Sequence, residues 1–333
     1  MSKVKIGIPK ALLYTYYISF WKPFFKKLGM EVVIPGNTNK QMVDIGVKNS
    51  VSEICVPIKV YIGHTLNLLE KDVDYIFVPR FESIRKNRFF CPKFMGLPDM
   101  IKHGVKKVKD KLLSCSIKTE TDDISDYRNY LSLLNKLDVT EKEVKNAAVY
   151  ASEKWNKFRS YNKMGYTAVE ANQMVEKDVS VKDSKQFEHN SNIKIGLMGY
   201  VYNLYDDFIS MDITSKLRDM GIDFITFDMM EEKELEESIA HMHKKLFWTF
   251  SNKVLGAGYK LFHSDSIDGI IHVTAFGCGP DSFLGKLFEL ESDKTGVPFM
   301  TIRIDEHTGN NHLQTRIEAF IDMLKRKKSN AVS

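Results

Sequence analysis

Three of the four cysteines share a local pattern that could do chemistry. Cys55, Cys91 and Cys278 are each followed by a proline within two residues, whereas Cys115 is not. Proline favours the first turn of a helix, so the pattern predicts that Cys55 and Cys278 stand at the amino ends of helices. There the free backbone N–H groups and the positive end of the helix dipole stabilise a thiolate or an anionic cluster. Proline also follows cluster-binding cysteines in ferredoxins.

Several interpretations of these thiols stay open from the residues alone. Cysteine is among the most buried residue types, so the three could belong to a hydrophobic core. An iron–sulfur site, a zinc site and thiol redox chemistry are the alternatives. The chain has no Cys-x-x-Cys pair, which argues against a zinc ribbon and a thioredoxin-type site. Three ligands rather than four would leave one metal position open to water, substrate or a partner group. Cys115 follows Leu112 and Leu113, and we predict a buried strand thiol there.

The composition is that of a globular protein. The chain has 333 residues, of which 43% are hydrophobic and 27% are charged, and this excludes a disordered, collagen-like or coiled-coil protein. A net charge of +5 demands no nucleic-acid-binding face. Four cysteines are too few for a disulfide-stapled secreted domain. The apolar stretch over residues 11–21 is too short to span a bilayer and has no cleavage site. We therefore expect a cytoplasmic protein that binds neither membrane nor nucleic acid.

The elements that must position the cysteines occur twice in the same order. Each half opens with a strand, continues with a helix that ends at a glycine, and later holds a short apolar strand. Gly29 and Gly221 end the helices, and the interval from each glycine to the aspartate that opens the apolar strand is 45 residues (29 to 74) or 47 residues (221 to 268). The sequence therefore predicts an α/β protein with two doubly wound, Rossmann- or flavodoxin-like parallel-sheet lobes related by an internal repeat.

In the first half we expect strands over 3–8, 30–34 and 74–78 and helices over 13–28, 39–47 and 57–70. In the second half we expect strands over 194–197, 222–227, 268–273 and 299–304 and helices over 207–220 and 313–328. Between the halves, apolar residues at helical spacing predict a helical connector. The expected domains are a first α/β lobe over 1–118, the connector over 119–190, and a second α/β lobe with a C-terminal helix over 191–333.

The positions of the cysteines in this fold suggest a shared site. Cys91 follows the strand over 74–78, and Cys278 follows the strand over 268–273. Both therefore lie beyond the carboxyl ends of parallel strands, where open α/β sheets bind ligands. One lobe supplies Cys55 and Cys91 and the other supplies Cys278, so we expect the three thiolates to converge in the cleft between the lobes.

Longer motifs surround these cysteines and resemble a known family. They cover residues 6–14, 53–60, 90–94, 96–99, 276–282, 305–309 and 315–320. Together they are similar to the acyl-CoA dehydratase activase-related (CoA protein activase) family, which belongs with the 2-hydroxyacyl-CoA dehydratases and benzoyl-CoA-reductase-like enzymes. The resemblance spans both lobes and leaves the connector out.

The resemblance implies a 4Fe–4S cluster held by Cys55, Cys91 and Cys278. Three cysteines favour one such unit per chain, and a double-cubane or bridged cluster stays open. Related proteins receive low-potential electrons from a separate ATP-hydrolysing iron–sulfur activator, which is the expected partner of an oxygen-sensitive homodimer or heterodimer. The absence of a P-loop motif agrees with ATP being used by a partner.

Two functions follow from the resemblance. The first is an iron–sulfur enzyme, a dehydratase or reductase, which uses ATP-coupled electron transfer to dehydrate or reduce a small molecule or acyl-CoA. The second is a non-catalytic cluster carrier, scaffold or accessory electron-transfer subunit. The sequence names no substrate and no catalytic residue.

Other side chains near these motifs have weaker assignments. Asp305, Glu306 and His307 follow the strand over 299–304, where they could support the cluster, transfer protons or cap the next helix. Glu53 and Lys59 flank Cys55 and could tune a cluster or contact substrate, against an ordinary surface or capping role.

Two further assignments favour packing over chemistry. His64 is expected to be a core histidine with its hydrogen bonds satisfied. Tyr14, Tyr16 and Tyr17 are expected to form a helix-packing stripe rather than a pocket wall.

Overall fold

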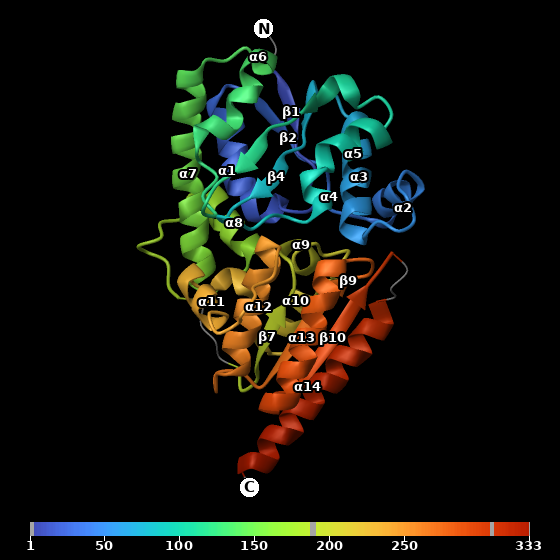
Figure 1. Cartoon of the computed structure of the whole chain (residues 1–333), viewed down its shortest axis with the longest axis vertical. Helices are drawn as coiled ribbons and strands as arrows, with labels where there is room; N and C mark the ends of the chain where they lie inside the picture. The colour runs from blue at the N-terminus through green and yellow to red at the C-terminus, as the bar shows by residue number, and fades with distance from the viewer. Residues whose placement is uncertain (1–2, 187–190, 307–309, 333) are drawn as a thin grey trace. The chain divides into compact units, whose positions relative to one another are not determined.

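The chain is an α/β protein with two separate four-stranded parallel sheets (Figure 1). The computed structural model describes residues 3–186, 191–306 and 310–332. The first sheet has the order β2-β1-β3-β5, from strands β1 (Lys5–Gly7), β2 (Glu31–Val33), β3 (Tyr75–Phe77) and β5 (Leu112–Leu113). The second has the order β8-β7-β9-β10, from strands β7 (Lys194–Met198), β8 (Asp223–Ile225), β9 (Gly269–Ala275) and β10 (Phe299–Ile304).

The two sheets repeat one topology, which confirms the predicted fold class. Numbered within its own half, each sheet has the strand order 2-1-3-4, the beginning of the flavodoxin-like order. The opening strands also have equivalent neighbours, since β1 pairs in parallel with β2 and β3, and β7 pairs in parallel with β8 and β9. A small parallel sheet of β4 (Arg80–Ser83) and β6 (Ser116–Lys118), which the sequence did not predict, belongs to the first half alone.

Helices α1 (Tyr14–Lys27), α2 (Lys40–Lys48), α3 (Val56–Leu69), α4 (Pro92–Met95) and α5 (Leu97–Gly104) connect the strands of the first sheet. Two of their predicted boundary signals are confirmed. Gly29 has the positive φ of 83° that a residue just past a helix end often adopts. The Asn39 side chain caps α2 by accepting a hydrogen bond from the backbone N–H of Met42 at 3.0 Å.

Helices α9 (Val201–Leu204), α10 (Ile213–Asp219), α11 (Glu232–Ser238), α12 (Thr249–Phe262), α13 (Gly279–Thr295) and α14 (Asn310–Val332) belong to the second half. The predicted helix over 207–220 begins later than expected. Met211 and Asp212 adopt positive φ angles of 51° and 56°, so the chain turns there and α10 begins only at Ile213. Gly221, with φ 67°, ends this helix region as predicted.

A close helix pair recurs in both halves and extends the repeat beyond the sheets. Gly63 is the eighth residue of α3, and a Cβ there would lie 2.1 Å from the backbone oxygen of Met42 on α2. Gly256 is the eighth residue of α12, and a Cβ there would lie 2.3 Å from the backbone oxygen of Leu235 on α11. Only glycine permits such an approach, so these positions keep two pairs of helix backbones nearly in contact.

Between the two sheets in sequence lie the helices α6 (Leu134–Leu137), α7 (Glu141–Lys163) and α8 (Ala168–Glu176), with short 3₁₀ turns at η1 (Lys109–Lys111), η2 (Tyr127–Leu133) and, later, η3 (Phe227–Met229). The chain forms two compact units. The first comprises the described residues up to Asn162 with Thr167–Ser184 and Phe247–Thr249, so most of the helical segment packs with the first sheet. The second comprises Lys163–Tyr166 and the described residues of Lys185–Leu246 and Phe250–Ser333.

The core of the first unit is rich in aromatic rings. Tyr16 and Tyr17 on α1 are buried, and the Tyr17 ring stacks on Trp155 of α7 with centroids 5.9 Å apart. This confirms the predicted packing stripe for these two tyrosines, while Tyr14 lines a small apolar cavity next to β3. Within the described residues, no helix has the length and apolar character needed to cross a membrane.

Candidate functional site

Cys55 stands at the amino end of α3, as the sequence predicted. It is the N-cap residue, with extended backbone angles, and Pro57 occupies the first turn of the helix. Its own carbonyl accepts the first hydrogen bonds of the helix, from the N–H groups of Ile58 at 3.1 Å and Lys59 at 3.3 Å. The residue is 8% exposed, so the thiol lies at the edge of the core rather than on the open surface.

Cys91 occupies the equivalent position on α4 and lies close to Cys55. It is the N-cap of that helix, with Pro92 as the first helical residue. Burial raises the pKa of the Cys91 thiol, and the neighbouring Cys55 raises it further, while the backbone N–H groups of Phe94 and Lys93 act in the opposite direction. Two thiols from different loops of the first unit therefore share one location and the dipoles of two helix ends.

Cys278 has the same local structure in the second unit. It follows β9 by three residues and is the N-cap of α13, with Pro280 in the first turn. Phe276 and Phe283 on either side of it are 68% and 53% exposed. All three proline-associated cysteines are thus helix N-caps, which confirms and extends the prediction made for Cys55 and Cys278.

Cys115 is buried, as expected, and this burial raises the pKa of its thiol. Its predicted place in a strand is wrong, because it lies in the short link between β5 and β6. None of the four cysteines, all of which the structure describes, takes part in a disulfide.

A three-thiol site stays a prediction. Cys55 and Cys91 belong to the first unit and Cys278 to the second. In the described part of the chain, no group of three or more His, Cys, Asp or Glu side chains is arranged to hold a metal ion.

The two charged neighbours of Cys55, Glu53 and Lys59, differ in how far they are buried. Lys59 is only 4% exposed, so a surface role for it is wrong. Glu53 is exposed; a hydrogen bond from its own backbone N–H lowers its pKa, and the Ser52 hydroxyl and the charge of Lys59 add to the effect. Lys59 is therefore a buried cation in the first turn of the helix that Cys55 opens.

His64 is a core histidine whose hydrogen bonds are only partly satisfied. Its Nε2 lies 2.8 Å from the Thr38 hydroxyl, whereas its buried Nδ1 finds no hydrogen-bond partner in the described part of the chain. Burial lowers the pKa of His64 to about 4, and the charge of Lys10 contributes to the shift. The imidazole is therefore neutral at physiological pH.

Sequence reasoning missed a buried polar cluster beside Cys278. His272 on β9, Asp281 on α13 and Asn203 on α9 all have an exposed fraction of 0%. His272 Nε2 donates to Asp281 Oδ1 at 2.9 Å, and Asn203 Nδ2 donates to Asp281 Oδ2 at 3.4 Å. The sequence offered one signal for this cluster, the aspartate that follows Pro280. A carboxylate is favourable in the first turn of a helix, so its type agrees with a helix start there.

The first unit has a related but exposed arrangement. Asp99 is the third residue of α5, again directly after a proline, and Arg80 Nη2 donates to its carboxylate at 2.7 Å. Arg80 also donates a hydrogen bond to the backbone oxygen of Met95, the last residue of the helix α4 that Cys91 opens. A hydrogen bond from Arg80 is the main cause that lowers the pKa of Asp99.

Three further predicted site residues follow strand β10 in the sequence. Asp305 and Glu306 follow β10 and are half-buried, and their roles stay predictions. His307 lies outside the described residues.

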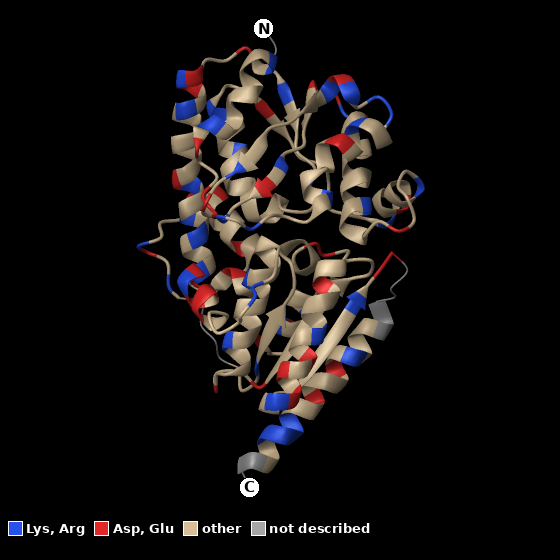
Figure 2. Ribbon diagram, in the orientation of Figure 1, with Lys and Arg blue, Asp and Glu red and all other residues tan. Residues whose placement is uncertain are grey.

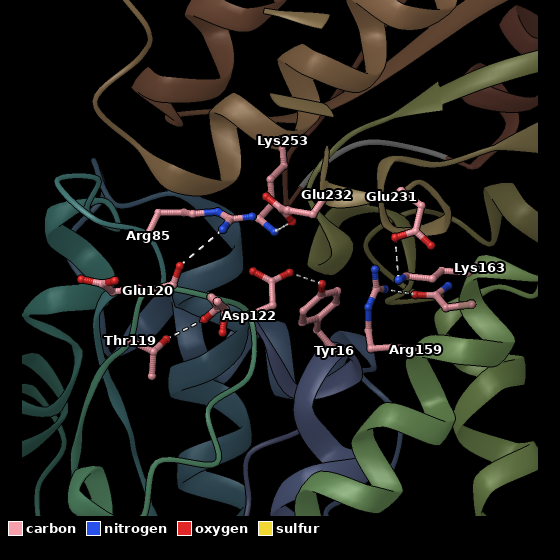
Figure 3. A network of polar contacts seen from close by, with 12 residues as sticks. Tyr16, Arg85, Thr119, Glu120, Asp122, Arg159, Lys163, Glu231, Glu232 and Lys253 are labelled. Atoms are coloured by element: carbon pink, nitrogen blue, oxygen red, sulfur yellow. Dashed lines mark hydrogen bonds and ion pairs between the residues drawn. The ribbon is translucent and has the colours of Figure 1, made fainter. Parts of the chain in front are cut away.

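A polar groove of about 770 Å³ lies at the carboxyl ends of β4 and β6, apart from the cysteines. Arg85 donates to the backbone oxygen of Glu120 at 3.3 Å across it (Figure 3). Arg128, which also lines the groove, forms an ion pair with Asp126 at 2.6 Å. Farther along, Asp122 accepts a hydrogen bond from the buried hydroxyl of Tyr16 at 2.7 Å (Figure 3). Acidic and basic side chains both line this groove, and Figure 2 shows side chains of both signs along α7 as well.

Taken together, the fold and the site define a tandem flavodoxin-like α/β protein with thiols at the amino ends of three of its helices. The profile of one family matches this chain over residues 5–230, described as the CoA enzyme activase uncharacterised domain (DUF2229). The chain belongs to that family. The matched region includes Cys55 and Cys91 and ends before Cys278. None of the curated proteins matches the chain.

Proposed function

We propose that this chain is an iron–sulfur protein of the 2-hydroxyacyl-CoA dehydratase type. Cys55, Cys91 and Cys278 would hold a 4Fe–4S cluster, and a separate ATP-hydrolysing activator would supply its electrons. The observation that carries the proposal is the pair of neighbouring thiols in the first unit, each an N-cap followed by proline.

The donor set at these positions suits such a cluster. Thiolates are the usual ligands of iron–sulfur clusters, and N–H groups at helix ends offset the negative charge that thiolates and cluster bring. Burial raises the pKa of Cys91 and the neighbouring Cys55 adds to the effect, so a cation or a metal beside the sulfur would favour the thiolate. When bound, a 4Fe–4S cluster supplies one-electron transfer at low potential. Lys59 is the buried cation nearest in sequence to Cys55, and we assign it to charge balance.

The decisive experiment is anaerobic purification of the full chain with iron, sulfide and zinc analysis. The proposal expects about four iron and four sulfide per chain. Cys55→Ser, Cys91→Ser and Cys278→Ser should each lower the iron content. Cys115→Ser is the matched control and should leave it unchanged, because that thiol is buried away from the helix ends.

Two results would contradict the proposal, and two others would decide between the enzyme and the carrier. Zinc in place of iron would reject the cluster. Equal iron loss in all four variants would mean a four-cysteine site without an open position. If iron is present, a substrate-dependent change in the EPR signal supports an enzyme, and cluster release to an apo-acceptor without turnover supports the carrier function.

A further inference from the structure

The first turn of α13 contains a carboxylate with no access to water. Asp281 is the third residue of this helix and has an exposed fraction of 0%. A buried carboxylate is costly unless hydrogen bonds replace its hydration. His272 on β9 donates to one of its oxygens at 2.9 Å, and Asn203 on α9 donates to the other at 3.4 Å. Two separate elements thus hold the first turn of α13.

Close contacts around His272 pack α13 tightly against β9. A Cβ at Gly285 of α13 would lie 3.3 Å from His272 Nδ1, so the helix backbone runs close over the ring. Phe288, almost one turn further along, meets the ring edge to face at a centroid distance of 5.4 Å. The helix is therefore seated on β9 by both a polar and an aromatic contact.

The polar cluster of His272, Asp281 and Asn203 costs the protein some stability. His272 Nδ1 and Asn203 Oδ1 are buried, and neither has a hydrogen-bond partner among the residues that the structure describes. Each such atom costs free energy that an apolar side chain of similar shape would avoid. Polar groups retained at this cost in one helix turn point to a role for that turn beyond packing.

The turn that this cluster holds is the one that begins at Cys278. Cys278 is the N-cap, three residues before Asp281, and its carbonyl accepts from the Ser282 N–H at 3.0 Å and from the Ser282 hydroxyl at 2.9 Å. Because the N-cap moves with the first turn, a shift of Asp281 carries Cys278 with it. We propose that His272 and Asp281 are positioning residues that keep Cys278 at the positive end of α13. Their importance for binding an iron–sulfur cluster rests on the proposed function.

The test measures the reactivity of Cys278 in the full chain after reduction and removal of metal by a chelator. The rate of alkylation by iodoacetamide is followed for each cysteine by peptide mass spectrometry over a range of pH. In Asp281→Ala, the thiolate of Cys278 loses its alignment with the helix end. Its alkylation near neutral pH should then slow by roughly threefold to tenfold, with the pH profile displaced to higher pH. Cys55 and Cys91, in the other unit, serve as internal references and should not change.

Two variants separate positioning from charge and from stability. Asp281→Asn keeps an oxygen that can accept from His272, so it should restore most of the wild-type rate. Glu291→Ala is the matched control on the same helix. Glu291 is buried and lies 2.8 Å from His263, but it stands 13 residues beyond Cys278 (278 to 291), about 20 Å along the helix. It should leave Cys278 alkylation unchanged.

The proposal is overturned if Asp281→Ala reacts at the wild-type rate, or faster, since a faster rate would mean that the carboxylate acts only through its charge. Equal slowing in Glu291→Ala would also overturn it. If Asp281→Ala does not fold, His272→Gln decides the question by the same readout. Iron analysis of the same variants is independent of these outcomes, because absence of iron in the wild type rejects the proposed function and leaves the alkylation result standing.

Discussion

Gly63 controls how closely α3, the helix that Cys55 opens, packs on α2. A Cβ at this position would lie 2.1 Å from the backbone oxygen of Met42 and 2.9 Å from its carbonyl carbon. Ordinary contacts begin at 3.4 Å, so Gly63→Ala forces the two backbones apart by about 1.3 Å (3.4 minus 2.1). Neither atom belongs to a side chain that can rotate away.

The expected loss of stability follows from two opposing effects. Overpacking of this kind costs about 3 kcal/mol, the upper end of its usual range, because the obstacle is backbone. Alanine recovers about 1 kcal/mol through its higher helix propensity. The net destabilisation is about 2 kcal/mol, which in a unit of this size lowers the melting temperature by roughly 4–8 °C.

Circular dichroism during thermal unfolding measures this effect. Gly104→Ala, at the end of α5, is the control, because no atom of the described residues outside its immediate neighbours lies within 4 Å of a Cβ there. It should leave the melting temperature unchanged or raise it slightly. Gly256→Ala, which meets the backbone oxygen of Leu235 at 2.3 Å, should behave like Gly63→Ala. The same melting temperature for Gly63→Ala and Gly104→Ala would refute the close helix approach.

Two further predictions concern titratable groups in the first unit. His64 has its pKa lowered to about 4 from the ordinary 6.5, so between these values the unfolded chain binds more protons than the folded one. Its contribution to the free energy of unfolding should therefore fall by up to about 3 kcal/mol as the pH drops from roughly 6.5 to 4. Urea titrations across this window check it, and an unchanged slope in His64→Gln would contradict the assignment. For Cys115, burial raises the pKa, so iodoacetamide should label it only after unfolding in urea. Native labelling as fast as that of Cys278, seen by mass spectrometry, would show that the thiol is accessible.

Much of the fold could be predicted because its signals are local. The glycines that end the two corresponding helix regions need a positive φ, and Gly29 and Gly221 both adopt one. The proline after a cysteine marks a helix start for a steric reason that needs no tertiary contact. The start of α10 was placed wrongly because Met211 and Asp212 turn the chain through positive φ angles. Aspartate adopts such angles more often than most residues, but methionine gives no signal of them in sequence.

The site could be predicted only in part. The sequence supplied the three candidate thiols and their place at helix ends, while the nearness of Cys55 to Cys91 comes from two separate segments, one after α2 and one after β4. Lys59 was assigned from its neighbours in the chain, whereas its burial depends on how α3 lies on the sheet.

By itself, the sequence determined the repeat, the α/β class and the helix-end cysteines, because periodicity, glycine and proline act over a few residues. Only the tertiary structure decided which polar groups meet in the core. His272 lies on a strand and Asp281 on a helix, and no spacing rule joins them. Their contact exists because α13 packs back onto β9, with Gly285 allowing the close approach. Such pairs depend on three-dimensional packing, in which residues distant or unrelated in pattern become neighbours.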